Sequence, residues 1–302
     1  MPEPIVFVVA SPRYGSAVMR GYQQAASVND VGGSARTLSA VADRPSLQEL
    51  RNTTVVLVKD AVVDDELVLS LSLGGNRLVW DAVDYCAHKP AVALPESPAE
   101  HLAGRAATEL VPEVLSMTAA TTAVVEQSFT GLRAVHAVDH QIDRRLMDAA
   151  GTSTATDFDV VYFGAPENLP AWADAVPSIR RLLTSVDAFD ALVPQARRAP
   201  VHADIRNPLR DRRNHKPWTK VATTLALGAL PIAENTDANV AALGDGHPFL
   251  FDGSLVDFER VLGVAEERWR AGELAPLFAS LASLRERSDP HQAARRLLDL
   301  LR

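Results

Sequence analysis

Short runs of continuous apolar residues, each bounded by polar residues, constrain this chain more than any other feature. Three of them lie in its N-terminal part, at 4–10 (PIVFVVA), 53–60 (TTVVLVKD) and 77–85 (RLVWDAVDY). A strand buried on one face alternates apolar and polar residues, whereas a strand buried on both faces is apolar throughout. The runs therefore predict strands of a parallel sheet that helices cover on both faces.

Helical patterns separate these strands. One begins near Ser16, and another covers 63–75, with acidic residues in its first turn and glycines at its end. Two more strands are predicted at 120–128 and 131–140. Alternation of strand and helix predicts βαβ units and a mostly parallel sheet.

The same order of elements starts again in the second half. The stretch 141–156 is polar and rich in small residues, which predicts a linker, and 157–164 (DFDVVYFG) predicts a new first strand. Further strands are predicted at 199–206, 228–234 and 247–254, and helices at 176–186, 255–272, 274–288 and from Pro290 to the end. A chain of 302 residues is long for one domain. We expect two doubly wound domains, 1–148 and 149–302.

Composition narrows the function classes. A formal net charge of −8 argues against bulk binding of nucleic acid. Cys86 is the only cysteine, so neither an intrachain disulfide nor a finger-type zinc site is expected, and the chain suits a reducing compartment. The N-terminus reads as a strand and not a signal peptide, and no run approaches the roughly 18 apolar residues of a membrane span. We expect a cytoplasmic protein, and its abundance of Ala, Arg and Val suggests a bacterial source.

The stretch 214–235 (NHKPWTKVATTLALGALPIAEN) places two lysines at the start of a helix. Lys216 and Lys220 are four apart and share one helix face, and Pro217 suits the first turn. Cations at a helix N-terminus are unfavourable unless an anion binds there, in which case the backbone N–H groups and both ammonium groups attract it. Arg206 and Arg210 lie just upstream, with Arg212 and Arg213. The alternative is a solvated basic face.

The order of these elements resembles the donor half of the GT-B glycosyltransferases. The basic loop, the helix ending in ALG and the strand ALPIAEN carry the resemblance. It extends to 77–85, which resembles a strand that ends in aspartates at the family's cleft, to 121–145, and to 157–170, which resembles the first strand and glycine loop of the donor domain.

The resemblance implies two Rossmann-like domains facing across a cleft, with the last helix able to cross back onto the first domain. It implies a hexosyltransferase-type enzyme that uses a nucleotide-diphosphate sugar without a metal or other cofactor. The acceptor would be a small molecule, a glycan or a lipid-linked compound. The residues expected around the donor are Lys216, Lys220, Arg206, Arg210, His215, Glu234 and Gly164.

One departure from the family pattern concerns the glutamates. Many retaining members carry a glutamate–x7–glutamate pair beside this helix, and the matching positions here are His215 and Thr223. The carboxylate contacts to the sugar and ribose therefore do not carry over. Glu234 is the alternative partner for a ribose hydroxyl, unless it only caps a helix.

An inverting transfer needs a base to deprotonate the acceptor hydroxyl. Asp81 and Asp84 lie at the end of a predicted strand and are the candidates, with His88 as a weaker one. The competing hypothesis is that Asp84 caps the following turn.

Other polar groups have structural explanations that we favour over catalysis. His136, Asp139, His140 and Asp143 suit a hydrogen-bonded exit segment better than a metal site. Asp157 and Asp159 precede their strand, whereas the Asp-x-Asp of metal-dependent GT-A transferases should follow one. In the first loop, Arg13, Tyr14, Ser16 and Arg20 could contact acceptor or phosphate, although Ser16 also suits an N-cap.

Two other functions compete with the transferase. One is a GT-B-shaped sugar-nucleotide epimerase, which the absent glutamates disfavour. The other is a catalytically silent GT-B module that binds or regulates a partner, and turnover of a sugar donor would separate it from an enzyme.

Overall fold

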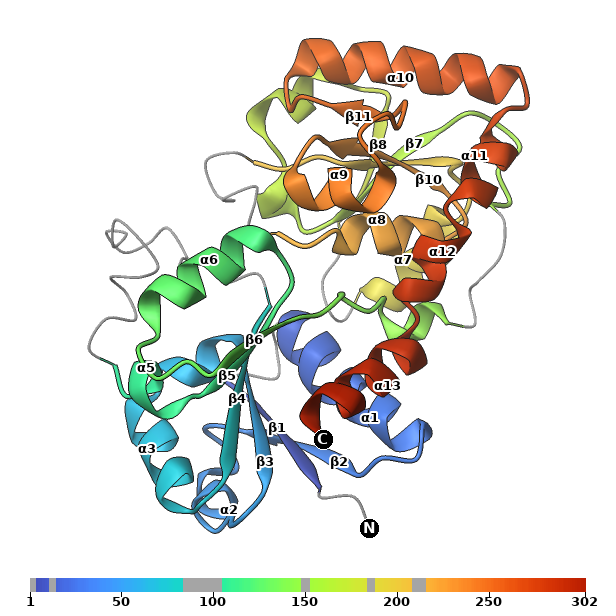
Figure 1. Ribbon diagram of the computed structural model, residues 1–302. Coiled ribbons are helices and arrows are strands. Elements are labelled where there is room, and N and C mark those ends of the chain that lie inside the picture. The colour runs from blue at the N-terminus through green and yellow to red at the C-terminus, as the bar shows by residue number, and fades with distance from the viewer. Residues whose placement is uncertain (1–3, 11–14, 84–104, 148–152, 184–187, 208–215) are drawn as a thin grey trace. The chain divides into compact units, whose positions relative to one another are not determined.

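The computed structural model describes residues 4–10, 15–83, 105–147, 153–183, 188–207 and 216–302. The chain divides into two units. Unit 1 consists of Met1–His140 and Pro290–Arg302, and unit 2 is Gln141–Asp289. Each unit contains one sheet with helices packed against it (Figure 1). The C-terminal residues therefore belong to the N-terminal unit.

The sheet of unit 1 has six strands in the order β2-β1-β3-β4-β5-β6, and every pair is parallel. This is the doubly wound order, and it confirms the strands predicted at 4–10, 53–60 and 77–85. The strands are β1 (Ile5–Val9), β2 (Ala35–Ser39), β3 (Thr54–Val58), β4 (Arg77–Val83), β5 (Glu113–Ser116) and β6 (Ala134–Ala137).

Helices cover both faces of this sheet. The helical segments are η1 (Ala17–Gln23), α1 (Gln24–Asp30), α2 (Arg44–Gln48), η2 (Lys59–Val63), α3 (Asp65–Leu73), α5 (Ala107–Leu110), α6 (Ala119–Ser128) and α13 (Pro290–Leu301). Alternate strand residues enter different cores. Leu57 and Trp80 pack with α3, whereas Val56 and Val79 pack with α1 and with Leu297 of α13. Figure 1 shows α13 beside α1, so the C-terminal helix is part of the core of unit 1.

The segment 120–128 was predicted as a strand, and this prediction is wrong. It forms α6, which Thr118 caps by accepting a hydrogen bond from the Thr121 backbone N–H at 3.1 Å. Val125 is buried, and Phe129 at the helix end stacks on Trp80 with ring centroids 5.1 Å apart. The β-branched residues suggested a strand, but capping and helical burial decide the structure.

The sheet of unit 2 has five parallel strands in the order β11-β10-β9-β7-β8. They are β7 (Val160–Gly164), β8 (Ile179–Leu183), β9 (Val201–Asp204), β10 (Leu230–Glu234) and β11 (Leu250–Phe251). The strands predicted at 157–164, 199–206 and 228–234 are thus confirmed. The parallel sheets of the two units confirm the predicted α/β class.

The helical segments of unit 2 are η3 (Arg144–Leu146), η4 (Pro166–Asn168), η5 (Ala171–Ala175), α7 (Phe189–Ala196), α8 (Thr219–Ala226), α9 (Asp237–Leu243), α10 (Leu255–Arg270), α11 (Leu274–Ser280) and α12 (Ala282–Arg287). Helices α8 and α10 lie on opposite sides of the sheet (Figure 1).

The prediction of a helix at 176–186 is wrong, because 179–183 forms the edge strand β8. Ile179 and Leu182 are both buried and lie three residues apart, a spacing that imitates a helical period. Pairing with β7 from Ile179 to Leu183 provides hydrogen-bond partners for the backbone groups along one side of this strand. Arg180 is anchored by an ion pair with Asp159 at 2.6 Å. Tertiary pairing therefore overrides the local pattern.

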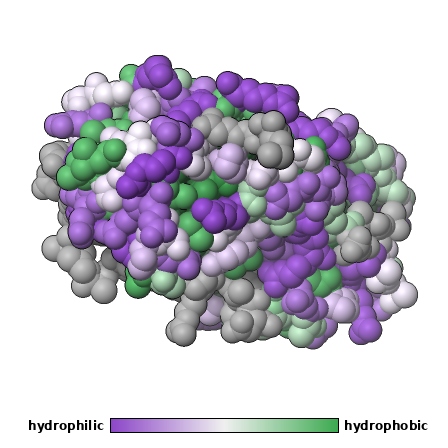
Figure 2. Space-filling view, turned by 90° about the horizontal axis from the view of Figure 1, so that it is seen from below, coloured by the Kyte–Doolittle hydropathy of each residue, from purple (hydrophilic) through white to green (hydrophobic). Residues whose placement is uncertain are grey.

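Within the described part of the chain, no helix is long and apolar enough to cross a membrane. Among the residues drawn in colour in Figure 2, hydrophobic side chains lie in separate patches between hydrophilic ones.

A buried carboxylate links neighbouring strands at the amino-terminal edge of the sheet of unit 1. Glu113 begins β5, is 3% exposed, and accepts a hydrogen bond from Arg77 Nε at 3.0 Å. Arg133 pairs with the same carboxylate, and Arg77 also donates to the backbone oxygen of Leu301 at the end of α13. Burial alone raises the pKa of Glu113, but the bonds from the two arginines outweigh it and lower the pKa from 4.5 to about 2.

We expect Glu113→Gln to destabilise unit 1 by about 1.5–3 kcal/mol at neutral pH, the range for hydrogen bonds to a charged group. A carboxyl whose pKa is lower in the folded state stabilises the fold above its unfolded pKa, and loses this effect as the pH falls through its folded pKa. The difference in unfolding free energy between wild type and variant should therefore shrink between pH 4.5 and about 2. Urea unfolding across this range measures it, and a difference that is independent of pH would contradict the prediction.

Candidate functional site

The carboxyl ends of the strands of unit 2 share one edge of its sheet, because all pairs are parallel. Strand β7 lies between β8 and β9, so the connections after β7 and after β9 run in opposite directions. Ligands bind at such a switch point in doubly wound folds. The register of β7 with β9 covers Val160–Val201 and Val161–His202, whereas β7 stays paired with β8 as far as Gly164. The carboxyl halves of β7 and β9 are therefore not paired with each other.

A pocket of about 140 Å³ lies at this position. Residues from β7, β9, α7 and α8 line it, namely Phe163, Gly164, Phe189, His202, Ala203, Lys220, Thr223 and Thr224. The lining includes two of the residues expected around the donor, Lys220 and Gly164. It also includes Thr223, one of the two positions that the sequence analysis matched to glutamates of the GT-B pattern.

Lys220 lies in the first turn of α8, and its side chain is 17% exposed. Its ammonium group lies 4.3 Å from the ring centroid of Tyr162 and 3.7 Å from Asp204 Oδ1, and it donates to the Ile205 carbonyl oxygen at 3.4 Å. A cation over an aromatic face is attracted by the ring quadrupole. The ammonium is thus held at the switch point by contacts within unit 2.

Asp204 ends β9 and is 2% exposed. Besides Lys220, it pairs with Arg206 Nε at 3.3 Å and accepts a hydrogen bond from Asn239 Nδ2 at 3.5 Å. A buried carboxylate needs such partners, because desolvation makes an unpaired charge costly. Sequence reasoning missed this residue, although an acidic side chain at the end of a buried strand was the signal available.

Glu234 ends β10 and is 1% exposed. Its Oε1 accepts the backbone N–H of Arg206 at 2.9 Å, and Asn239 Nδ2 donates to its backbone oxygen at 2.9 Å. The carboxylate therefore fixes the segment that follows β9. Contact of Glu234 with a ribose stays a prediction.

Gly164 ends β7 next to the side chain of Tyr162. The Tyr162 hydroxyl donates to the Ala165 carbonyl oxygen at 2.8 Å, and a Cβ at Gly164 would lie 2.8 Å from that hydroxyl oxygen. Only glycine leaves room for this bond. The bond in turn fixes the ring beneath Lys220.

His202 lies in the middle of β9 and is 2% exposed. Its Nε2 lies 2.9 Å from the Ala196 carbonyl oxygen, which can only accept, so Nε2 carries the proton. Burial lowers the pKa of His202 to about 4, so the ring is neutral at pH 7. Among the described residues its Nδ1 has no hydrogen-bond partner.

The remaining predicted residues around the donor are only partly covered by the structure. Lys216 is half-buried and lies just before α8, which begins at Thr219. The prediction that Lys216 shares a helix face with Lys220, with Pro217 in the first turn, is therefore wrong. Arg210, His215 and the candidate base Asp84 lie outside the described residues.

Asp81, the other candidate base, lies on β4 of unit 1 and is fully buried. Arg20 Nε donates to its Oδ2 at 2.7 Å, and the Val83 backbone N–H donates to its Oδ1 at 3.2 Å. Arg20 is itself 2% exposed. This carboxylate holds a buried guanidinium, and its action as a base stays a prediction.

His136 of unit 1 and Asp143 of unit 2, two residues of the predicted exit segment, contact neighbouring groups. His136 Nε2 lies 3.5 Å from Glu113, and Asp143 accepts the Arg145 backbone N–H at 3.0 Å. In the described ranges, no group of three or more His, Cys, Asp or Glu side chains is placed to hold a metal ion.

Solved structures of several proteins resemble the chain over nearly its whole length. Anabaena Alr3699/HepE in complex with UDP-glucose aligns with a TM-score of 0.63 and 10% identity, covering 99% of both chains. The α,α-trehalose 6-phosphate synthase of Burkholderia multivorans aligns with a TM-score of 0.59 and 10% identity, covering 100% of this chain and 96% of the other. The lipopolysaccharide outer core galactosyltransferase WaaB aligns at 0.55 and 7% identity, covering 99% of each. No family model and no curated protein sequence matches the chain.

At these identities the likeness establishes the fold. The chain has the fold of the GT-B glycosyltransferases, with two Rossmann-like units, as the order of its sequence elements predicted.

Gly164→Ala should lower the melting temperature of unit 2, because the added methyl group displaces the Tyr162 hydroxyl from its bond to Ala165. A loss of about 1–3 kcal/mol is expected for overpacking of a buried site. Gly263→Ala is the matched control. Apart from the nearby backbone of α10 itself, no atom of the described residues lies within 4 Å of a Cβ added at this position. Alanine also favours a helix over glycine by about 0.5–1 kcal/mol. Thermal unfolding that shifts both variants equally would contradict this account of Gly164.

Proposed function

We propose that the chain is a glycosyltransferase that moves a hexosyl group from a nucleotide-diphosphate sugar to a hydroxyl of an acceptor. The observation that carries the proposal is the position of the Lys220 ammonium, held at the switch point of a sheet with the GT-B order of elements. The neighbouring structures support it, because Anabaena Alr3699/HepE contains UDP in one structure and UDP-glucose in another, and further neighbours are a synthase and a galactosyltransferase.

The diphosphate would lie over the start of α8. Backbone N–H groups at a helix N-terminus attract phosphate oxygens. Lys220 adds positive charge to the first turn of α8, and Lys216 adds positive charge just before the helix begins. Asp204 and Glu234 are nearly fully buried, so they hold the loop and the cations in place without facing solvent. Arg210 and His215 would complete the donor site as the sequence predicts. Thr223 offers a hydroxyl where many retaining GT-B enzymes have a carboxylate.

The reaction breaks the bond between the anomeric carbon and the β-phosphate oxygen. The acceptor oxygen forms the new bond to that carbon, its proton passes to a base, and the nucleoside diphosphate leaves with the bonding electrons. Negative charge therefore grows on the leaving oxygen, where fixed cations stabilise the transition state most. We propose that these cations act without a metal ion, and that Asp84 is the base if the transfer inverts.

Lys220→Met should weaken binding of the cognate nucleoside diphosphate about 10- to 100-fold, as expected for loss of a bond worth about 1.5–3 kcal/mol to a charged group. Calorimetric titration with UDP, GDP, dTDP, CDP and ADP identifies the preferred nucleobase and measures the loss of affinity. Lys220→Arg keeps the charge and should recover part of the affinity.

Arg270→Gln is the control for net charge, since this exposed arginine at the end of α10 pairs with Glu266 one turn earlier. Its affinity should equal that of the wild type, and melting curves verify that every variant is folded. Absence of binding by the wild type to all five nucleotides, or full affinity in folded Lys220→Met, would overturn the proposed donor site.

Turnover separates the enzyme from a silent module. With UDP-glucose and other sugar nucleotides, and a panel of glycan and lipid-linked acceptors, the wild type should release nucleoside diphosphate faster than the buffer blank. Release should fall at least tenfold in Lys220→Met. Nucleotide binding without any release, across the whole panel, would favour a binding module instead.

A further inference from the structure

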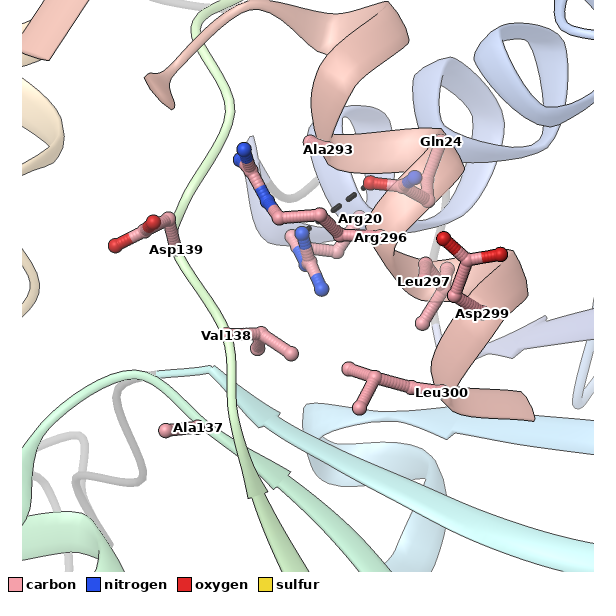
Figure 3. A pocket seen from close by; sticks show the side chains of 10 residues that line it. All are labelled: Arg20, Gln24, Ala137, Val138, Asp139, Ala293, Arg296, Leu297, Asp299 and Leu300. Atoms are coloured by element: carbon pink, nitrogen blue, oxygen red, sulfur yellow. Dashed lines mark hydrogen bonds between the residues drawn. The ribbon is translucent and has the colours of Figure 1, made fainter. Parts of the chain in front are cut away.

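A second pocket, of about 360 Å³, is lined by residues of unit 1 alone. It shares no residue with the proposed donor site. It is bounded by η1 and α1, by α13, and by the end of β6 with the two residues that follow it (Figure 3). Its lining is Arg20, Gln24, Ala137, Val138, Asp139, Ala293, Arg296, Leu297, Asp299 and Leu300. The C-terminal helix thus supplies about half of the wall.

The polar floor of this pocket is built from two buried side chains. Gln24 is fully buried, and its Oε1 accepts a hydrogen bond from Arg20 Nη1 at 3.2 Å. Its Nε2 is also buried, and no described residue accepts a bond from it. A buried amide donor left in this state costs free energy, which a ligand acceptor would recover.

Arg20 is fixed in place before any ligand arrives. Its Nε is bonded to Asp81, and its Nη1 to Gln24, which together use two of the five N–H donors of a guanidinium. The residue lies in η1, a seven-residue π-helical segment. Such segments are rare and occur often at functional sites. Figure 3 shows the Gln24 amide and the Arg20 guanidinium beside α13, across the pocket from the segment 137–139.

The charges of the pocket argue against an anion. Arg20 and Arg296 carry positive charge, whereas Asp139 and Asp299 line the same pocket and Asp81 already neutralises Arg20. A phosphate or carboxylate would therefore meet no net positive charge. The rest of the wall is apolar and includes Val138, Leu297 and Leu300.

We propose that this pocket binds a neutral polyhydroxylated small molecule of about monosaccharide size. Hydroxyl groups both donate and accept, so they suit a wall that combines amide and guanidinium donors with carboxylate acceptors. The C–H faces of such a ring pack on leucine and valine side chains. Ligand oxygens accept from Gln24 Nε2 and from Arg20. The residues involved all belong to unit 1, so the site goes beyond the proposed donor site and does not depend on it.

The test uses the full chain and nuclear magnetic resonance. Methyl glucoside, methyl galactoside and N-acetylglucosamine are titrated while the side-chain amide signal of Gln24, assigned with Gln24→Asn, is followed. Inorganic phosphate at the same concentrations is the anionic comparison. At least one sugar should shift the Gln24 signal in a saturable way, and phosphate should not.

Two variants on α13 locate the site. Leu300→Trp fills the pocket and should weaken sugar binding at least tenfold, and Arg296→Ala should weaken it several-fold. Arg295→Ala is the matched control, because Arg295 is the exposed neighbour on the same helix and is not part of the lining; its affinity should be that of the wild type. Melting temperatures confirm that the variants are folded.

Three results would overturn the proposal: no sugar of the panel shifts the Gln24 signal, phosphate shifts it while the sugars do not, or folded Leu300→Trp binds sugar as tightly as the wild type.

Discussion

Parallel pairing is the constraint on which both units depend. Because every strand pair is parallel, each connection has to return across a face of the sheet, and helices then bury both faces. The same constraint brings all carboxyl strand ends to one edge. In unit 2 this edge gathers Gly164, Asp204 and Glu234 from strands that are far apart in sequence. The candidate donor site is thus a consequence of the sheet topology.

Both units use a buried carboxylate to fix a cation near a strand end. Asp204 pairs with Lys220 and Arg206 in unit 2, and Asp81 pairs with Arg20 in unit 1. Taking a charge out of water is costly, so a buried carboxylate is stable only with its partners in place. The cations are therefore positioned before a ligand binds. Such preorganisation is what a site that stabilises a developing charge requires.

The parts predicted correctly from sequence were those with a strong local signal. The apolar runs at 4–10, 77–85 and 157–164 are continuous because their strands are buried on both faces, and their order was enough to indicate the fold. The predictions for 120–128 and 176–186 were wrong. At 120–128 the helix cap of Thr118 outweighed the β-branched residue types, and at 176–186 pairing with β7 outweighed the helical spacing of buried residues. Lys220 was found from its place at a helix start. Its partner Asp204 and the pocket around Gln24 were not, since they depend on contacts between distant segments.

The proposed donor site requires that a nucleoside diphosphate binds at the carboxyl edge of the sheet in unit 2. Hydrogen–deuterium exchange of the wild-type chain with and without UDP tests it most directly, with GDP, dTDP, CDP and ADP run in parallel. Bound nucleotide should slow exchange in peptides that cover 164–170, 204–207 and 216–226, and should leave exchange at the amino-terminal edge of the same sheet unchanged. Slower exchange confined to unit 1, or no change with any of the five nucleotides, would contradict it.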